Sequence, residues 1–146
     1  MNHLTKRAER ILRLAKEIAR DYGQGYVGTE HLLLAIVREE TGLGAKVLIE
    51  HGATDARLTE EIDHLVQGRL EETWVMGRLP GTPHFKDVIA RAIEESRGHG
   101  NWQICSIHLL LALVAEKGSM AYKALRNLGV TQEVVRRGLR QQSVPV

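Results

Sequence analysis

Apolar residues recur every three or four positions over residues 5–22, and this period is typical of an amphipathic helix. Thr5 stands at its start, where a threonine hydroxyl can accept a hydrogen bond from a backbone N–H of the first turn. Gly23 and Gly25 follow and indicate where the helix ends. The sequence therefore predicts a first helix with one buried face. The apolar positions are Ala8, Ile11, Leu12, Ala15, Ile18 and Ala19.

The stretch over residues 29–39 has a different pattern. Its residues from Leu32 to Val37 are apolar on every side, so we expect this helix to be buried all round. Thr29 is expected to be its N-cap. Glu30 lies in the first turn, where a carboxylate stabilises the helix dipole and can also face a cationic ligand. On spacing alone, a well-capped helix start without any site is the simpler interpretation.

Two shorter helices complete the first half, over residues 43–51 and from a cap at Thr54 onward. The second half has the same order. Thr82 caps a helix with Pro83 at its first position, a favoured pairing, and Gly98 and Gly100 end it. The remaining three helices are predicted from a cap at Ser106 through the apolar residues 109–114, over 120–128, and from a cap at Thr131 to near Gln142.

This plan recurs at an offset of 77 residues, which places His31-Leu-Leu-Leu-Ala35 on His108-Leu-Leu-Leu-Ala112 without a gap. The offset also matches cap residues and glycines, which composition alone does not explain. One helical unit is therefore used twice, and we expect a pseudo-twofold axis to relate the copies. The matched pairs include Thr5 with Thr82, Gly23 with Gly100, Gly52 with Gly129, and Thr54 with Thr131.

We therefore predict an all-α fold, an eight-helix bundle made of two tandem four-helix repeats with pseudo-twofold symmetry. The chain is expected to be a single domain over 1–146, with repeat one at about 4–67 and repeat two at about 82–142. The segment between them, at about 68–81, lacks periodicity and is expected to be a surface connector. Neither half can bury its second helix alone, so the halves should fold as one cooperative unit.

Composition narrows the classes of function. The chain has 43% hydrophobic and 26% charged residues, as in soluble globular proteins. A net charge of +2 is only weak evidence for a polyanion partner. Because only 4% of the residues are aromatic, a base-stacking nucleic-acid surface is not expected. A single cysteine, Cys105, excludes an internal disulfide and suits a reducing compartment. Without a signal peptide or a membrane-length apolar run, we expect a cytoplasmic protein that contacts no membrane.

The usual motifs of catalysis and cofactor binding do not occur in the sequence. It has no P-loop, no Gly-x-Ser-x-Gly elbow and no His-Glu-x-x-His pattern. His31 and His108 lie beside leucines at matching places, so we interpret them as packed or capping histidines. No cofactor and no metal are therefore expected. The other histidines are scattered along the chain, at His3, His51, His64, His84 and His99.

The chain carries the strings Leu4-Thr5-Lys-Arg-Ala8, Tyr26-Val-Gly-Thr-Glu-His-Leu-Leu-Leu-Ala35 and Leu48 to Gly52, followed by a second copy of the unit. In this order they closely resemble the N-terminal double-repeat domain of Clp chaperones. The resemblance covers about 4–142 and is nearest to the ClpC branch. It implies a domain without catalysis that receives protein substrates and docks adaptors for ATPase rings, which unfold proteins for the ClpP protease. In ClpC-type members it also implies binding of phosphorylated arginine as a degradation mark.

The resemblance further implies which residues bind that mark. The family's glutamate in the Gly-Thr-Glu-His string holds the guanidinium, and the threonine that starts the first helix of each repeat helps to hold the phosphate. These positions are Glu30, Thr5 and Thr82 in this chain. The fourth position departs from the family, because Ile107 stands where the second glutamate is expected. An isoleucine cannot pair with a guanidinium, so at most one of the two sites binds in the family's way.

The leading hypothesis is a non-catalytic protein-binding module of the Clp unfoldase/protease system, expected to be a monomer. Its partners would be protein substrates or adaptors, or a Clp ATPase or ClpP in trans. The family continues into ATPase modules and this chain stops at Val146, so an excised domain and a free-standing accessory or decoy subunit are both open.

Two other classes of function are ranked lower than these. One is a small helical hydrolase that uses Glu30 with His31. The other is a nucleic-acid binder that uses Arg136, Arg137 and Arg140.

Overall fold

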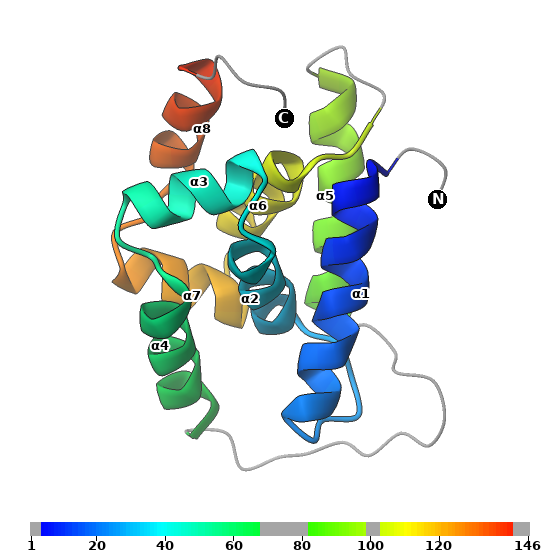
Figure 1. The fold of residues 1–146 in the computed structure, drawn as a ribbon, viewed down its shortest axis with the longest axis vertical. Helices are drawn as coiled ribbons and strands as arrows, with labels where there is room; N and C mark the ends of the chain where they lie inside the picture. The colour runs from blue at the N-terminus through cyan, green and yellow to red at the C-terminus, as the bar shows by residue number, and fades with distance from the viewer. Residues whose placement is uncertain (1–3, 68–81, 99–102, 142–146) are drawn as a thin grey trace.

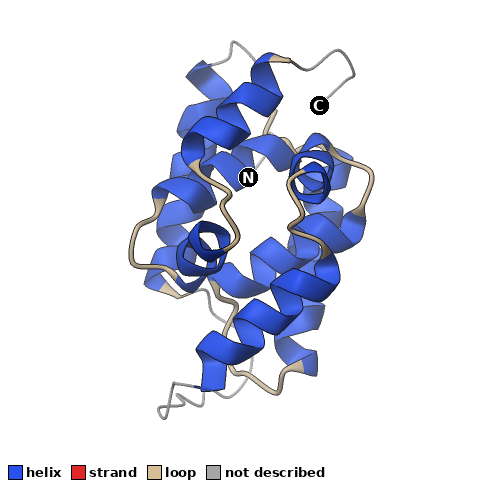
Figure 2. Ribbon diagram, turned by 90° about the vertical axis from the view of Figure 1, so that its left-hand side faces the viewer, coloured by secondary structure: helices blue, strands red, loops and turns tan. Residues whose placement is uncertain are grey.

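The computed structural model describes residues 4–67, 82–98 and 103–141. Within these ranges the chain forms helices joined by loops and no strand (Figure 2), which confirms the all-α prediction. The predicted connector over 68–81 lies outside the described residues. The helices are α1 (Lys6–Asp21), α2 (Thr29–Glu39), α3 (Leu43–Glu50), α4 (Asp55–Gln67), α5 (Pro83–Gly98), α6 (Ser106–Ala115), α7 (Met120–Asn127) and α8 (Gln132–Arg140).

The helix ends follow the local chemistry of the sequence. Thr5 Oγ1 accepts a hydrogen bond from Ala8 N at 3.1 Å, and Thr82 Oγ1 accepts one from Phe85 N at 3.1 Å, so both threonines cap as predicted. Thr131 Oγ1 caps α8 in the same way. The turns after α3 and α7 need the left-handed backbone region, and a glycine stands at each place. These are Gly52, with a φ of 80°, and Gly129, with a φ of 81°.

The two leucine-rich helices, α2 and α6, form the centre of the molecule (Figure 1). Every residue from Thr29 to Val37 is buried in α2, and every residue from Ser106 to Val114 is buried in α6. This confirms that both helices are buried all round. Each fully buried leucine contributes about 2 kcal/mol by leaving water, so these helices supply much of the hydrophobic free energy.

Helices of the two halves pack on each other in matching pairs. Helix α3 packs on α6 and α8, and its counterpart α7 packs on α2 and α4. Helices α2 and α6 also contact each other directly, and the buried apolar residues of both halves form one cluster. The halves therefore share a single core, as cooperative folding requires. In the described part of the chain, none of the helices combines the length and the apolar character needed to cross a membrane.

Candidate functional site

The starts of α2 and α6 are the places to which the sequence directs attention, and each lies against the first helix of the other half. Thr82 N, at the start of α5, donates to Val27 O at 3.0 Å. Thr5 N, at the start of α1, donates to Ile104 O at 3.2 Å. The structure therefore places the expected site residues at two separate helix starts. Thr82 lies at the α2 start, which carries Glu30, whereas Thr5 lies at the α6 start, which carries Ile107.

A histidine closes the first turn of both helices. Gly28 N donates to His31 Nδ1 at 2.8 Å, and Cys105 N donates to His108 Nδ1 at 2.9 Å. Each ring thus satisfies a backbone N–H that would otherwise be left unpaired at a buried helix start. The interpretation of these residues as capping histidines is confirmed.

His31 is held in its neutral form. It is fully buried, and burial lowers the pKa of its imidazole from 6.5 to about 4. Since Nδ1 accepts the hydrogen bond from Gly28, the single ring proton lies on Nε2. A buried ring in this state is poorly placed to exchange protons with a substrate, which argues against the hydrolase hypothesis built on Glu30 and His31.

The expected caps Thr29 and Ser106 have a different role. The N-caps are Gly28 and Cys105, so that prediction is wrong. Thr29 Oγ1 instead accepts from Ala121 N of α7 at 3.2 Å.

Ser106 Oγ makes the matching bond, from Gly44 N of α3 at 2.9 Å. Both hydroxyls therefore cap the third helix of the opposite half. This partner lies far away in the sequence, which is why local capping rules did not find it.

The two helix starts differ in charge. Glu30 is only 3% exposed, and a Cβ atom added at Gly28 would collide with the Glu30 carboxylate. In the other half Cys105 and Ile107 occupy these two positions, and both are buried. Burial raises the pKa of the Cys105 thiol, although the nearby charge of Arg7 opposes the shift. The α2 start therefore carries a carboxylate above a glycine, and the α6 start carries two uncharged side chains.

The two threonines also differ. Thr5 Oγ1 both accepts from Ala8 N and donates to Ile104 O, at 3.3 Å. Thr82 Oγ1 accepts from Phe85 N, and within the described ranges no acceptor takes its proton. Among the described residues, the Thr5 hydroxyl therefore both donates and accepts, whereas the Thr82 hydroxyl only accepts.

A second group of polar side chains differs between the halves. In the first half, Glu39 pairs with Arg10 at 3.2 Å and with Arg7 at 3.6 Å. Residues 84, 87 and 116 occupy the matching positions of the second half, and they are His84, Asp87 and Glu116.

The second-half group has the composition of a metal site. The ligand atoms of its three side chains all lie within 4.8 Å of one another. Sequence reasoning missed this group, because Glu116 is far from His84 along the chain. Comparing residues at the repeat offset matches them to Arg7, Arg10 and Glu39, but only the structure shows that each set lies together.

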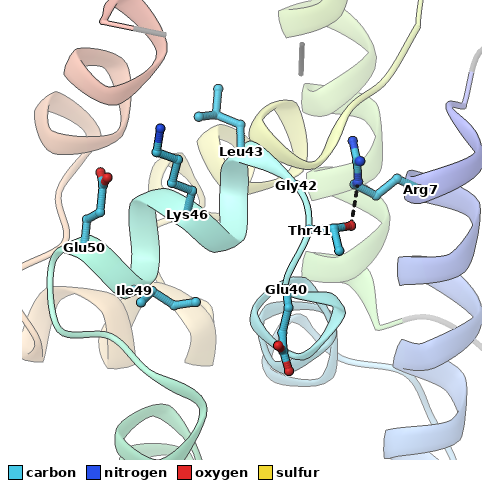
Figure 3. A pocket seen from close by; sticks show the side chains of 8 residues that line it. All are labelled: Arg7, Glu40, Thr41, Gly42, Leu43, Lys46, Ile49 and Glu50. Atoms are coloured by element: carbon cyan, nitrogen blue, oxygen red, sulfur yellow. Dashed lines mark hydrogen bonds between the residues drawn. The ribbon is translucent and has the colours of Figure 1, made fainter. Parts of the chain in front are cut away.

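A surface pocket of about 590 Å³ lies where α1 meets the turn between α2 and α3 (Figure 3). Arg7 points from α1 towards this turn, and its Nε donates to Thr41 Oγ1 at 3.0 Å. Ile49, at the pocket's edge, is 46% exposed. The pocket shares no residue with the α2 start, and its charged residues are of both signs. These residues are Arg7, Lys46, Glu40 and Glu50.

The arginines of α8 are paired with carboxylates. Arg136 forms an ion pair with Glu95 at 2.8 Å, while Arg137 and Arg140 both lie within 4 Å of Glu133, at 3.7 and 3.0 Å. These pairs neutralise much of the positive charge that a polyanion would need, so α8 does not favour the nucleic-acid hypothesis.

Comparison with known proteins agrees with this architecture. The sequence matches the family model described as the Clp repeat (R) N-terminal domain over residues 3–75 and 81–144. It is 36% identical over 137 residues to the negative regulator of genetic competence ClpC/MecB of Bacillus subtilis, covering 94% of this chain and 16% of that protein. It is 37% identical over 126 residues to the ATP-binding subunit ClpC of Staphylococcus epidermidis, covering 86% of this chain and 15% of that protein.

Among solved structures, the N-terminal domain of the chaperone ClpD from Arabidopsis thaliana has the same fold. The two structures superpose with a TM-score of 0.72 at 22% sequence identity, covering 95% of this chain and 94% of that one. The chain spans only about a sixth of the length of the two curated relatives.

Proposed function

This chain belongs to the Clp repeat N-terminal domain family, and from that premise we propose that it is a non-catalytic module that binds substrates or adaptors for a Clp unfoldase/protease system. The observation that carries the proposal is the family match, which extends over both halves of the chain. A monomeric state and a cytoplasmic location, which the sequence predicts, belong to the same proposal.

The ligand proposed for the α2 start is a protein segment that carries phosphorylated arginine. A phosphoguanidinium group has a positive and a negative part, so its site needs a carboxylate and a set of donors. Glu30 supplies the carboxylate. The donors come from the start of α5, where the Thr82 hydroxyl and the positive end of the helix dipole favour an anion.

The burial of Glu30 sets a condition on this binding. Because the side chain is only 3% exposed, the ligand must uncover the carboxylate before a guanidinium can reach it. An ion pair formed in such a recess is less screened by water than one at the surface, which compensates part of the cost.

The α6 start does not fit the same ligand. Ile107 and Cys105 are buried and uncharged, and the Thr5 hydroxyl donates to Ile104 O. We therefore assign one phosphoarginine site to each chain, at Glu30 and Thr82.

Calorimetry with a phosphoarginine peptide tests this site, with the same peptide bearing unmodified arginine as the control. We expect one phosphoarginine peptide per chain and at least tenfold weaker binding of the unmodified one. Glu30→Gln should lose at least tenfold in affinity because it keeps the shape and removes the charge. Thr82→Val should weaken binding, and its counterpart Thr5→Val should not. Equal affinity of Glu30→Gln and the unchanged chain would contradict the assignment.

The broader proposal is tested by retention on immobilised Clp ATPase, ClpP and candidate adaptors. Retention on an adaptor, or of an unfolded substrate, supports the module as stated. Retention on ClpP or on the ATPase would indicate an accessory role in trans. Failure to bind any of these proteins would contradict the proposal.

A further inference from the structure

A cluster of one imidazole and two carboxylates joins the first turns of α5 to the end of α6. His84 and Asp87 lie three residues apart in α5, on one face of the helix. Glu116 is the C-cap of α6, and its side chain is only 9% exposed. His84 Nδ1 lies 2.7 Å from Glu116 Oε2. The potential ligand atoms of the three residues are all within 4.8 Å of one another.

The matching cluster of the first half shows what has changed. There Glu39 faces two guanidinium groups, from Arg7 and Arg10, which leave no net negative charge for a cation. In the second half both arginines are replaced, by the imidazole of His84 and by the carboxylate of Asp87. The three matching positions have therefore changed from two arginines around a carboxylate to three side chains that can ligate a metal, while Arg91 pairs with Glu116 from another position, at 3.2 Å.

The loop that follows Glu116 lies against the imidazole. Gly118 has a φ of 100°, and the site of a Cβ there would lie 3.6 Å from His84 Cε1 and 3.8 Å from Nε2. The matching residue of the first half is Thr41, whose hydroxyl interacts with Arg7 and Glu39 instead. The histidine ring thus rests against a backbone without a side chain, between Gly118 and Glu116.

We propose that His84, Asp87 and Glu116 bind a divalent transition-metal cation of the zinc type. One imidazole nitrogen and two carboxylate oxygens form a three-ligand set that suits zinc and leaves a fourth position for water. The two carboxylates outweigh the single positive charge of Arg91, so the cluster keeps a negative charge that attracts a cation. The ion takes the place of the direct contact between His84 Nδ1 and Glu116 Oε2.

The geometry requires only a small adjustment. Two ligand atoms bound to one tetrahedral zinc lie about 3.3 Å apart, so the His84–Glu116 pair must open by about 0.6 Å. The His84 side chain is 50% exposed and can move by that amount. Arg91 lies 3.2 Å from the other oxygen of Glu116, Oε1, so Oε2 stays available to the ion.

Titration of the chelator-treated full chain with zinc chloride, followed by calorimetry, tests this site. We expect one ion per chain with a dissociation constant in the micromolar range, and a higher thermal midpoint when zinc is present. Cobalt chloride should give the intense visible absorption of a tetrahedral site. No peptide ligand is needed, so this result and the phosphoarginine result can fail independently.

The variants use the two exposed ligands, because Glu116 is buried and its replacement can unfold the protein. His84→Ala and Asp87→Asn should each lower zinc affinity at least tenfold. The double variant His84→Arg with Asp87→Arg copies the first half and should bind no zinc while remaining folded. His64→Ala, at an exposed histidine of α4, is the control and should bind as the unchanged chain does.

Absence of saturable zinc binding would overturn the proposal. Wild-type affinity in both His84→Ala and Asp87→Asn would overturn it as well, since the ion would then be bound elsewhere on the chain.

Discussion

The starts of α2 and α6 occupy matching places in the two halves, and they keep some residues while changing others. The capping histidine is kept, and so is the hydroxyl that bonds to the opposite half. The other two positions change together, from Gly28 with Glu30 to Cys105 with Ile107. The kept residues make the hydrogen bonds that hold the two halves together, whereas the changed pair replaces a buried carboxylate by buried uncharged side chains.

The two changed positions depend on each other sterically, because the side chain at one limits the room at the other. A side chain at position 28 would collide with the Glu30 carboxylate, so that carboxylate requires a glycine beneath it. Once the carboxylate is lost, as at Ile107, a larger residue such as Cys105 can fill the space. The two substitutions therefore make sense only together, and this coupling can be measured.

The largest effect is expected from Ile107→Glu, which forces a carboxylate into the α6 start. Ile107 is fully buried, so the variant should lose about 4 kcal/mol in free energy of unfolding. Adding Cys105→Gly should recover about 1–2 kcal/mol by making room for the carboxylate. Urea unfolding of the four members of this double-mutant cycle measures the coupling, and strictly additive effects would refute it.

The pH dependence of stability should be the next largest effect. Folding lowers the pKa of His31 from 6.5 to about 4, so between these values the unfolded chain binds the extra proton. The contribution of His31 to the free energy of unfolding is therefore complete above pH 6.5. It is lost as the pH falls towards 4, by about 3 kcal/mol.

His31→Gln isolates this contribution, because a glutamine at the third helical position can still accept from the N-cap backbone. The free energy of unfolding, measured from pH 7 to pH 4, should fall less steeply in His31→Gln than in the unchanged chain. The matched control is His108→Gln, which retains His31. Parallel curves for His31→Gln and the unchanged chain would show that another group causes the loss.

A smaller effect is expected at the two hydroxyl bridges between the halves. Thr29→Val and Ser106→Ala each leave a buried backbone N–H unpaired, at Ala121 and Gly44, and should cost about 1–2 kcal/mol. Thr29→Ser keeps the hydroxyl and should cost less. Thermal unfolding should show one transition that shifts in each variant. Two separate transitions would mean that the halves do not unfold together.

The smallest effect is expected at the helix caps outside the centre. Thr5→Ala and Thr82→Ala should each cost about 1 kcal/mol, the usual value for a lost N-cap. Thr5→Ala should cost a few tenths more, because its hydroxyl also donates to Ile104 O. Denaturant midpoints of the two variants, measured together, give this difference. A larger loss for Thr82→Ala would reverse the order inferred from the hydrogen bonds.

Local patterns were enough to predict most of the helices. The apolar period located α1, the fully apolar run located α2, and threonines marked four of the helix starts. These features act within one or two turns of chain, so neighbouring residues carry all the information. The duplication then implied a shared core, since neither leucine-rich helix can be buried by one half alone.

What the sequence by itself determined is therefore the set of helices, their duplication and the burial of α2 and α6, because local hydrogen bonding and hydrophobic periodicity specify these. Only the tertiary structure decided that Thr29 and Ser106 bond to the opposite half, and that Glu30 is covered. It alone also brought His84 and Asp87 to Glu116. These contacts join residues far apart in the chain, and their geometry depends on how the packed core orients whole helices.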